Sequence, residues 1–168
     1  MPRSLAILGS ARNDGHTTAL LARLMEGSDC EVVDVNAVRI ANYRYNQRYD
    51  ADDAFMGIVA TMIASPITVF ATPVYWYSFS AVMKTYIDRL SDLLTSPNKD
   101  IGRRLRGKRR GLVSSGSDPE PDHDLISAFT RTCEYLGVEF IGSVYGVEGG
   151  AFVDEQAADK LRTLLRGA

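Results

Sequence analysis

The segment of residues 9–18 constrains the fold more than any other part of this sequence. It reads Gly-Ser-Ala-Arg-Asn-Asp-Gly-His-Thr-Thr, follows the apolar run 5–8 and precedes the helical pattern 19–25. α/β proteins build phosphate sites from a strand, a loop of small and hydroxyl residues and then a helix, because the first amides of a helix lack partners and carry partial positive charge. The side chains expected to contact a phosphate are Ser10, Arg12, His16, Thr17 and Thr18.

This loop differs from two common nucleotide-binding loops. A P-loop needs glycine, four residues and then Gly-Lys-Ser/Thr, but Gly9 and Gly15 are separated by five residues and His16 stands where the lysine is required. The Gly-x-Gly-x-x-Gly fingerprint of a dinucleotide site is missing as well. We therefore expect a phosphate site without Mg–ATP chemistry. The alternative is a plain turn between strand and helix, capped by Thr17.

Length, charge and cysteine content narrow the class of protein. The chain has 168 residues, a formal net charge of −2 and no apolar stretch long enough to cross a bilayer. We expect one domain over residues 1–168, with no signal peptide and neither a membrane nor a nucleic acid as partner. Cys30 and Cys133 lie far apart and form no Cys-x-x-Cys pair, so we expect both to be reduced and buried in a cytoplasmic protein.

Strand and helix patterns alternate along the whole chain. Unbroken apolar runs such as 67–72 suit strands buried on both faces, as in a parallel sheet. Five strands alternating with five helices predict an α/β fold: a flavodoxin-like, doubly wound five-stranded parallel sheet of order 2-1-3-4-5, with helices on both faces. The expected strands are 5–8, 31–35, 67–72, 111–114 and 138–145.

The helix boundaries follow from capping residues. Asp52 and Asp53 are expected to cap a helix that runs to residue 64, and Asp154 to cap the last helix. Two further helices are expected over 80–93 and 122–136, the second ended by Gly137 in a left-handed conformation.

The loops after the first, third and fourth strands should meet at one edge of this sheet, where doubly wound folds bind ligands. Four aromatic residues crowd the second of these loops, residues 72–80. Pro73 ends the strand there, and the aromatic side chains can form a flat apolar wall. A planar heteroaromatic ring with a phosphate tail fits both loops; an aromatic plug against a neighbouring subunit is the alternative. The wall would consist of Tyr75, Trp76, Tyr77 and Phe79.

Three motifs carry a family resemblance: Gly-Ser-x-Arg-x-x-Gly-x-Thr at 9–17, Thr-Pro-Val-Tyr-Trp-Tyr-Ser at 72–78 and Met-Lys-x-x-Ile-Asp-Arg at 83–89. Together they resemble the flavodoxin-like NAD(P)H-dependent FMN reductase (quinone reductase) family. The resemblance implies bound FMN and a homodimer or homotetramer. By position it implies that the FMN phosphate is held by Ser10, Arg12, His16, Thr17 and Thr18. It likewise implies that the isoalloxazine is lined by Thr72, Pro73, Val74, Tyr75 and Trp76. A third flavin-contacting loop is implied at Ser115, Gly116 and Ser117.

The activity implied is that of an FMN-dependent oxidoreductase with NADH or NADPH as co-substrate. Hydride would pass through flavin N5 to a small acceptor, such as a quinone, a free flavin, an azo compound or a nitroaromatic, in a ping-pong scheme. The cofactor does the redox chemistry, so we expect no catalytic protein acid or base and no metal. The alternatives are a flavodoxin-type electron carrier, which the near-neutral charge and the lack of an aromatic residue at 114–122 disfavour, and a flavin-free regulatory or assembly protein.

Two other segments are unusual. Where many relatives have a cysteine-rich stretch, residues 41–50 hold three tyrosines and two arginines, which indicate a lid, a substrate pocket, a subunit contact or a mobile surface loop. The basic run 103–110 precedes the fourth strand, so it should lie at the amino ends of the sheet, opposite the site, as a solvated or inter-subunit patch.

Overall fold

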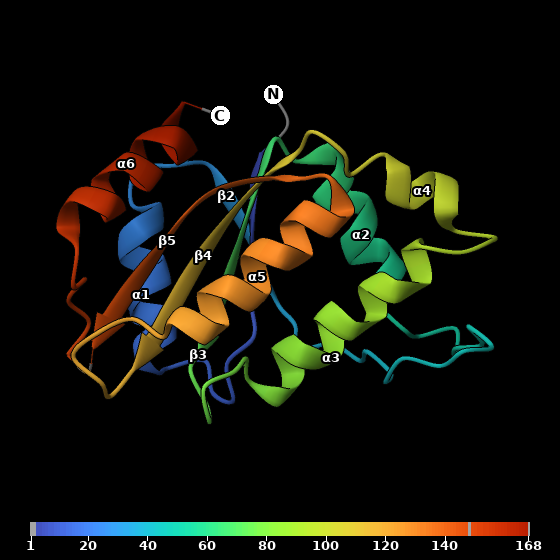
Figure 1. Ribbon diagram of the computed structural model, residues 1–168, viewed down its shortest axis with the longest axis horizontal. Helices are drawn as coiled ribbons and strands as arrows, with labels where there is room; N and C mark the ends of the chain where they lie inside the picture. The colour runs from blue at the N-terminus through green and yellow to red at the C-terminus, as the bar shows by residue number, and fades with distance from the viewer. Residues whose placement is uncertain (1–2, 148, 168) are drawn as a thin grey trace.

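The computed structural model describes residues 3–147 and 149–167, and its centre is a five-stranded parallel sheet of order β2-β1-β3-β4-β5 (Figure 1). This confirms the flavodoxin-like α/β architecture expected from the sequence. Each strand is one to four residues longer or shifted by one relative to the apolar run that predicted it. The strands are β1 Ser4–Leu8, β2 Cys30–Asp34, β3 Ile67–Pro73, β4 Arg109–Gly116 and β5 Glu139–Val147.

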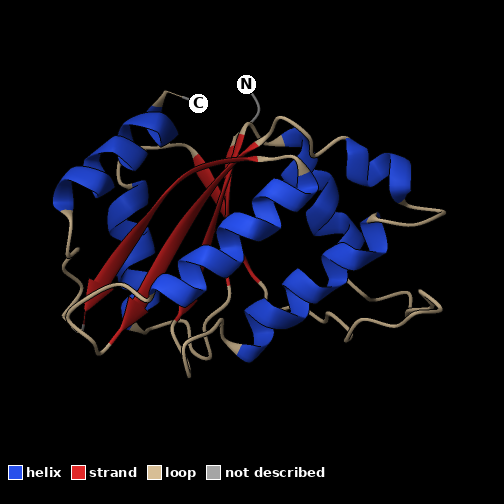
Figure 2. Cartoon of the chain, viewed as in Figure 1, coloured by secondary structure: helices blue, strands red, loops and turns tan. Residues whose placement is uncertain are grey.

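Helices cover both faces of the sheet (Figure 2). Apolar side chains of α1 and α6 pack on one face, and those of α2, α3 and α5 pack on the other, which gives two separate apolar clusters. Strand residues alternate between these clusters, with Ile7 and Phe70 in one and Leu8 and Val69 in the other. The helical elements are α1 His16–Met25, α2 Phe55–Ala64, α3 Ala81–Arg89, the 3₁₀ turn η1 Leu90–Leu93, α4 Lys99–Arg103, α5 His123–Leu136 and α6 Glu155–Arg166.

The helix ends confirm part of the predicted capping. Ser80 accepts a hydrogen bond from the Met83 amide at the start of α3, Asp154 caps α6, and Gly137 ends α5 with φ of 68°. The predicted 80–93 helix was wrong in part, because the α-helix ends at Arg89 and continues as the η1 turn. Helix α4 was not predicted.

The predicted cap of α2 was also wrong in part. Ala54 holds the N-cap position, and its side chain makes no capping hydrogen bond. Asp52 instead pairs with exposed Arg39, at 2.7 Å. The Asp53 carboxylate accepts from the Phe55 amide but points mainly into the core, where it meets Arg89. Asp53, which the local pattern assigned to the helix end, is thus mainly the ion-pair partner of buried Arg89.

The tyrosine- and arginine-rich segment is anchored to the end of α3. Arg89 is 1% exposed and donates to the Ala41 carbonyl oxygen (3.0 Å) and to Asp53 (2.7 Å). Its guanidinium carbon lies 3.4 Å from the Tyr49 ring centroid, and Tyr49 donates to Asp92 at 3.0 Å. The segment is therefore fixed at both ends by one buried cation.

The basic run lies at the amino ends of the strands, as expected. Arg109 is in register with Ile67 and Glu139, the first residues of β3 and β5. The expectation of a solvated or inter-subunit patch was wrong for Arg110, which is only 3% exposed. Of the two cysteines, Cys133 is buried as expected, whereas Cys30 on the edge strand β2 is half-buried; both are free thiols.

Candidate functional site

The loop after β1 is held in place by its glycine. The Gly9 amide donates to the Ala71 carbonyl oxygen of β3 at 2.8 Å, and its own carbonyl oxygen accepts from the Ser80 hydroxyl at 2.6 Å. A Cβ atom at Gly9 would lie 2.7 Å from Cβ of Met83, so a side chain does not fit there. The loop is thereby fixed to both β3 and the start of α3.

The amino end of α1 opens onto this loop. Gly15 is the N-cap and makes no side-chain capping bond, so the expectation that Thr17 caps this turn was wrong. The amides of Thr17 and Thr18 lie in the first turn, where the helix has no internal partners for them and carries a partial positive charge. The Thr18 hydroxyl is buried and has no hydrogen-bond partner among the described residues.

Two hydrogen bonds join the three expected loops. The hydroxyls of Thr17 and Ser115 lie 2.7 Å apart, which connects α1 to the end of β4. The Val74 amide donates to the Ser115 carbonyl oxygen at 2.7 Å, which connects the loops after β3 and β4. These contacts bring segments from three parts of the sequence to one edge of the sheet, at the lower ends of the strands in Figure 1.

Two hollows lie side by side at this edge. The first has a volume of about 370 Å³ and the second about 360 Å³. Val74, Gly116 and Ser117 line both. The first is lined by Ser10, Arg12, Gly15, His16, Thr17, Pro73, Val74, Tyr75, Ser115, Gly116 and Ser117. The second also has Trp76, Tyr77, Asp118, Glu120, Pro121, Asp122, His123 and Tyr145 in its wall.

Ten of the thirteen residues expected at the cofactor site therefore line the first hollow. Of the other three, Trp76 lines the second hollow. Thr72 is fully buried, and its hydroxyl accepts from the Ser80 amide at 3.1 Å while donating to the Pro73 carbonyl oxygen. Thr72 and Thr18 line neither hollow.

The expected aromatic wall is only partly formed. Trp76 and Tyr77 are 93% and 69% exposed, at the tip of a turn closed by mutual backbone hydrogen bonds between Tyr75 and Ser78. Both have positive φ values, 51° and 62°, which cost energy in residues with a side chain. Phe79 was wrongly assigned to the wall: it is buried and packs against Phe129. The turn thus holds two aromatic rings in solvent beside the second hollow.

The two hollows differ in charge. Arg12 reaches into the first, with Asp14 at 3.7 Å, and Nδ1 of His16 accepts from the Gly149 amide at 3.5 Å. Asp118, Glu120 and Asp122 line the second. The first hollow therefore combines a cation with a helix amino end, whereas the second is acidic.

Tyr145 is a residue of this site that the sequence analysis missed. It donates to the Asp118 carbonyl oxygen at 2.8 Å, and burial together with nearby Asp118 and Asp122 raises the pKa of its hydroxyl. Its only signal in the sequence is its position near the end of the fifth strand. The acidic residues of the second hollow lie in the segment between β4 and α5, and only their place beside Trp76 relates them to the site.

Two further features, a metal-binding cluster and a membrane-spanning helix, are absent from the described part of the chain. Among residues 3–147 and 149–167, no group of three or more His, Cys, Asp or Glu side chains is placed to hold a metal ion. Within the same residues, no helix is long and apolar enough to span a membrane.

Comparison with known proteins identifies the family. Residues 2–151 match the sequence profile of the NADPH-dependent FMN reductases. The chain belongs to this family. It is accordingly an oxidoreductase of the NAD(P)H-dependent FMN type.

Individual relatives agree with this family. The chain is 26% identical over 171 residues to the NAD(P)H-dependent FMN-containing oxidoreductase YwqN of Bacillus subtilis, covering 95% of this chain and 94% of YwqN. A solved structure of a Trp repressor binding protein from Bacillus subtilis superposes with a TM-score of 0.75 at 26% identity, covering 97% and 100% of the two chains. An FMN-dependent NADH-azoreductase from Bacillus anthracis, solved with FMN, shares the fold with a TM-score of 0.68, at 10% identity and 97% coverage of both chains.

Proposed function

We propose that this chain binds FMN across the two adjoining hollows, with the phosphate in the first and the isoalloxazine ring reaching the second. The observation that carries the proposal is the convergence of an uncapped helix amino end with a neighbouring hollow walled by Trp76 and Tyr77. The two hollows share three lining residues, Val74, Gly116 and Ser117. In this proposal one elongated ligand contacts these three residues where the hollows meet.

The first hollow suits a phosphate dianion. Arg12 supplies a positive charge, Ser10 and Thr17 supply hydroxyls, and the α1 amides point from the end of a helix. The buried Thr18 hydroxyl, which lacks a partner in the described chain, has an unused hydrogen-bond donor beside this loop. An anion seated close enough to the first turn of α1 to reach the Thr18 hydroxyl would give this donor a partner.

The second hollow suits a flat ring. Trp76 and Tyr77 supply aromatic faces, and Tyr145 with the loop backbone supplies polar contacts at the edge. The Thr17–Ser115 and Val74–Ser115 hydrogen bonds hold the three loops at fixed separation, so the site needs little reorganisation on binding.

FMN bound here supplies two-electron hydride chemistry, taking hydride from NADH or NADPH and passing it to a small acceptor in a ping-pong sequence. We expect quinones, free flavins, azo compounds or nitroaromatics as acceptors. The protein's part is to position the ring, to leave one side open for two alternating substrates and to tune the ring by hydrogen bonds. We further propose a homodimer or homotetramer, in which the exposed aromatic turn is a candidate contact.

The first test is spectroscopic. We expect the purified protein, or the protein after incubation with FMN, to show a flavin spectrum that bleaches with NADH or NADPH and returns with a quinone. Arg12→Met should weaken FMN binding about tenfold, because one charge-assisted contact is lost. Arg103→Met is the matched control, because Arg103 is also exposed and also pairs with a nearby aspartate, Asp100. Failure to bind FMN, or bound FMN that no acceptor reoxidises after reduction, would refute the proposal.

A further inference from the structure

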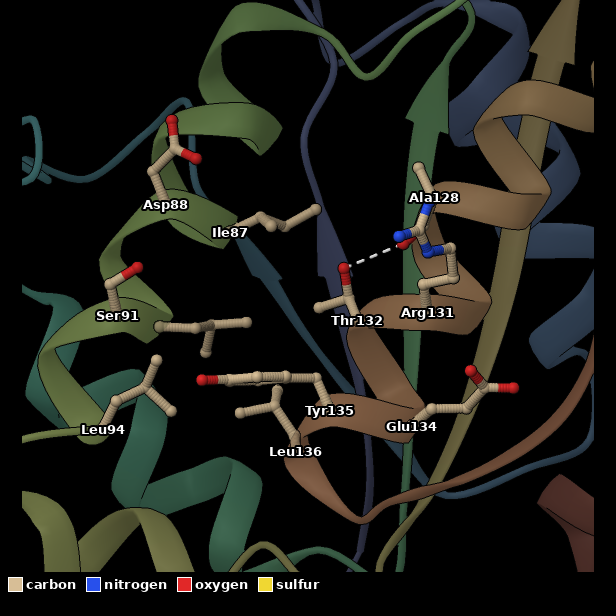
Figure 3. Close-up of a pocket in the computed structure, with 11 residues that line it drawn as sticks. Ile87, Asp88, Ser91, Leu94, Ala128, Arg131, Thr132, Glu134, Tyr135 and Leu136 are labelled. Carbon is tan, nitrogen blue, oxygen red and sulfur yellow. Dashed lines mark hydrogen bonds between the residues drawn. The ribbon is translucent and has the colours of Figure 1, made fainter.

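A groove separates α3 and η1 from α5 (Figure 3). It has a volume of about 750 Å³ and lies between helices rather than at the loop edge of the sheet. Tyr135 reaches from α5 toward α3 across it, and Thr132 lies deeper, its hydroxyl donating to the Ala128 carbonyl oxygen at 2.8 Å. None of the residues that line the two cofactor hollows lines this groove.

Beneath the groove lies a small interior cavity of about 20 Å³. Ile87, Leu90, Thr132 and Leu136 line both spaces, so these side chains form the partition between them. Most of the remaining wall is apolar, from side chains of α2, β3 and α5. The exception is Arg110, the second residue of β4.

Arg110 is a buried cation without a counter-charge in the described structure. It is 3% exposed, and its Nη1 donates to the Arg109 carbonyl oxygen at 2.8 Å. Its Nη2 is buried and has no hydrogen-bond partner among the described residues, nor does any carboxylate of those residues pair with it. Burial lowers the pKa of Arg110 to about 10, so the guanidinium remains charged at neutral pH.

The groups around this guanidinium do not neutralise it. The Tyr86 hydroxyl donates to the Met62 sulfur at 3.8 Å, and burial raises its pKa. Burial also raises the pKa of the Cys133 thiol to about 12, so both groups stay protonated. A buried unpaired charge is costly, and a neutral water at Nη2 would satisfy a hydrogen bond without compensating the charge. An anion compensates the charge directly.

We propose that the cavity and the groove above it bind a small organic monocarboxylate, with its carboxylate at Nη2 of Arg110 and its apolar tail between α3 and α5. The cavity alone is too small for the ligand, so binding requires the Leu90 and Leu136 side chains, which line both spaces, to move aside. One guanidinium among apolar side chains matches a single negative charge with an aliphatic or aromatic tail. It does not match a dianion such as phosphate, which would keep an uncompensated charge in an apolar site.

Hexanoate and hexanamide form a matched pair of probes, because they have the same tail and differ in charge. We expect hexanoate, but not hexanamide, to bind the FMN-saturated protein in isothermal titration and to raise its Tm. Saturation with FMN keeps the probe out of the phosphate loop, and Arg12→Met protein should bind hexanoate with unchanged affinity if that loop is not involved. This control makes the result independent of whether the proposed FMN site is correct.

Arg110→Met tests the residue itself. The Kd of hexanoate should rise about tenfold or more, since a hydrogen bond to a charged group is lost. Arg109→Met, a neighbour whose side chain points to the other face of the strand, should leave the Kd unchanged. A Kd that Arg110→Met leaves unaltered would overturn the proposal.

Comparing hexanoate with hexanamide on the wild-type protein tests the carboxylate site even if Arg110→Met does not fold. Equal binding of hexanoate and hexanamide, or no binding of hexanoate at millimolar concentration, would contradict the proposal. If sedimentation then showed a dimer that Tyr135→Glu dissociates, the groove would be a contact between copies of this chain, and the carboxylate site would be rejected.

Discussion

The hydroxyls of Thr17 and Ser115 lie 2.7 Å apart, although the two residues are 98 positions apart in the sequence. Thr17 is in the first turn of α1, and Ser115 is near the end of β4. Because Ser115 also accepts the Val74 amide through its carbonyl oxygen, one residue connects all three loops of the proposed FMN site. The geometry of the phosphate loop is therefore tied to the strand that borders the ring.

Thr17→Val should disturb both binding and stability. Valine keeps the shape of threonine but leaves the buried Ser115 hydroxyl without this partner. We expect the FMN Kd to rise about tenfold and the free energy of unfolding to fall by about 1 kcal/mol. Quenching of FMN fluorescence and urea unfolding measure the two effects.

Thr163→Val is the control for this change. Thr163 lies on α6, and its exposed hydroxyl donates to the carbonyl oxygen of Asp159 in its own helix. We expect no change in FMN affinity for this variant. Equal Kd values for wild type and Thr17→Val would show that the hydroxyl bridge plays no part in the site.

The sequence predicted the order of the sheet and the meeting of the loops because both follow from periodicity and from connection rules. Runs such as 67–72 mark buried strands, and parallel strands place their carboxyl ends at one edge. The meeting of the three loops at the first hollow followed from that rule, whereas the family resemblance implied the individual residues of the loops after β3 and β4. It did not require knowledge of any single long-range contact.

The wrong predictions concern side chains whose positions depend on the folded structure around them rather than on the local sequence. Phe79 sits in the core because Phe129, 50 positions away, packs against it, and Asp53 turns from the α2 end because Arg89 is buried beside it. Arg110 belongs to a run that looks solvated, but the period-two alternation of β4 turns one arginine of this run inward. The positions of Phe79 and Asp53 depend on partners distant in sequence, which a local pattern does not contain, whereas that of Arg110 depends on where the fourth strand begins.

Trp76 provides an internal probe of the ring site. It is the only tryptophan in the chain and is 93% exposed, so the free protein should show the red-shifted emission of a solvated indole. FMN placed against the turn should quench this emission in proportion to occupancy. Titration of the apoprotein, followed by fluorescence, measures the effect. Emission that FMN does not quench would place the ring away from Trp76.

The Asp53–Arg89 pair should make stability depend on pH. Burial alone would raise the pKa of Asp53, but hydrogen bonds from Arg89 and from the Ala41 and Phe55 amides outweigh it, and the pKa lies below its ordinary value. The stabilisation is therefore complete above the unfolded-state pKa of about 3.9 and is lost as the pH falls through the lower folded-state pKa.

Asp53→Asn measures this contribution. At pH 7 the variant should be about 2–3 kcal/mol less stable than wild type, because a buried hydrogen bond between charged groups is lost. The difference should shrink below pH 4 as the wild-type carboxylate becomes protonated. Asp52→Asn is the control, because its ion pair with Arg39 is exposed and should matter little at any pH. A difference for Asp53→Asn that stays constant to pH 2 would contradict the assignment.

Gly116 and Tyr145 should be energetically coupled. A Cβ atom at Gly116 would lie 2.7 Å from the Tyr145 hydroxyl oxygen, which donates to the Asp118 carbonyl oxygen. Gly116→Ala should therefore displace the Tyr145 ring and the loop at Asp118, costing about 1–3 kcal/mol of stability and weakening FMN binding. Tyr145→Phe removes the clashing oxygen while keeping the ring, so adding Gly116→Ala to that variant should cost less than in wild type. A double-mutant cycle of unfolding free energies and FMN Kd values measures the difference. If the two changes were additive within about 0.3 kcal/mol, the close approach of the hydroxyl would not be what reserves this position for glycine.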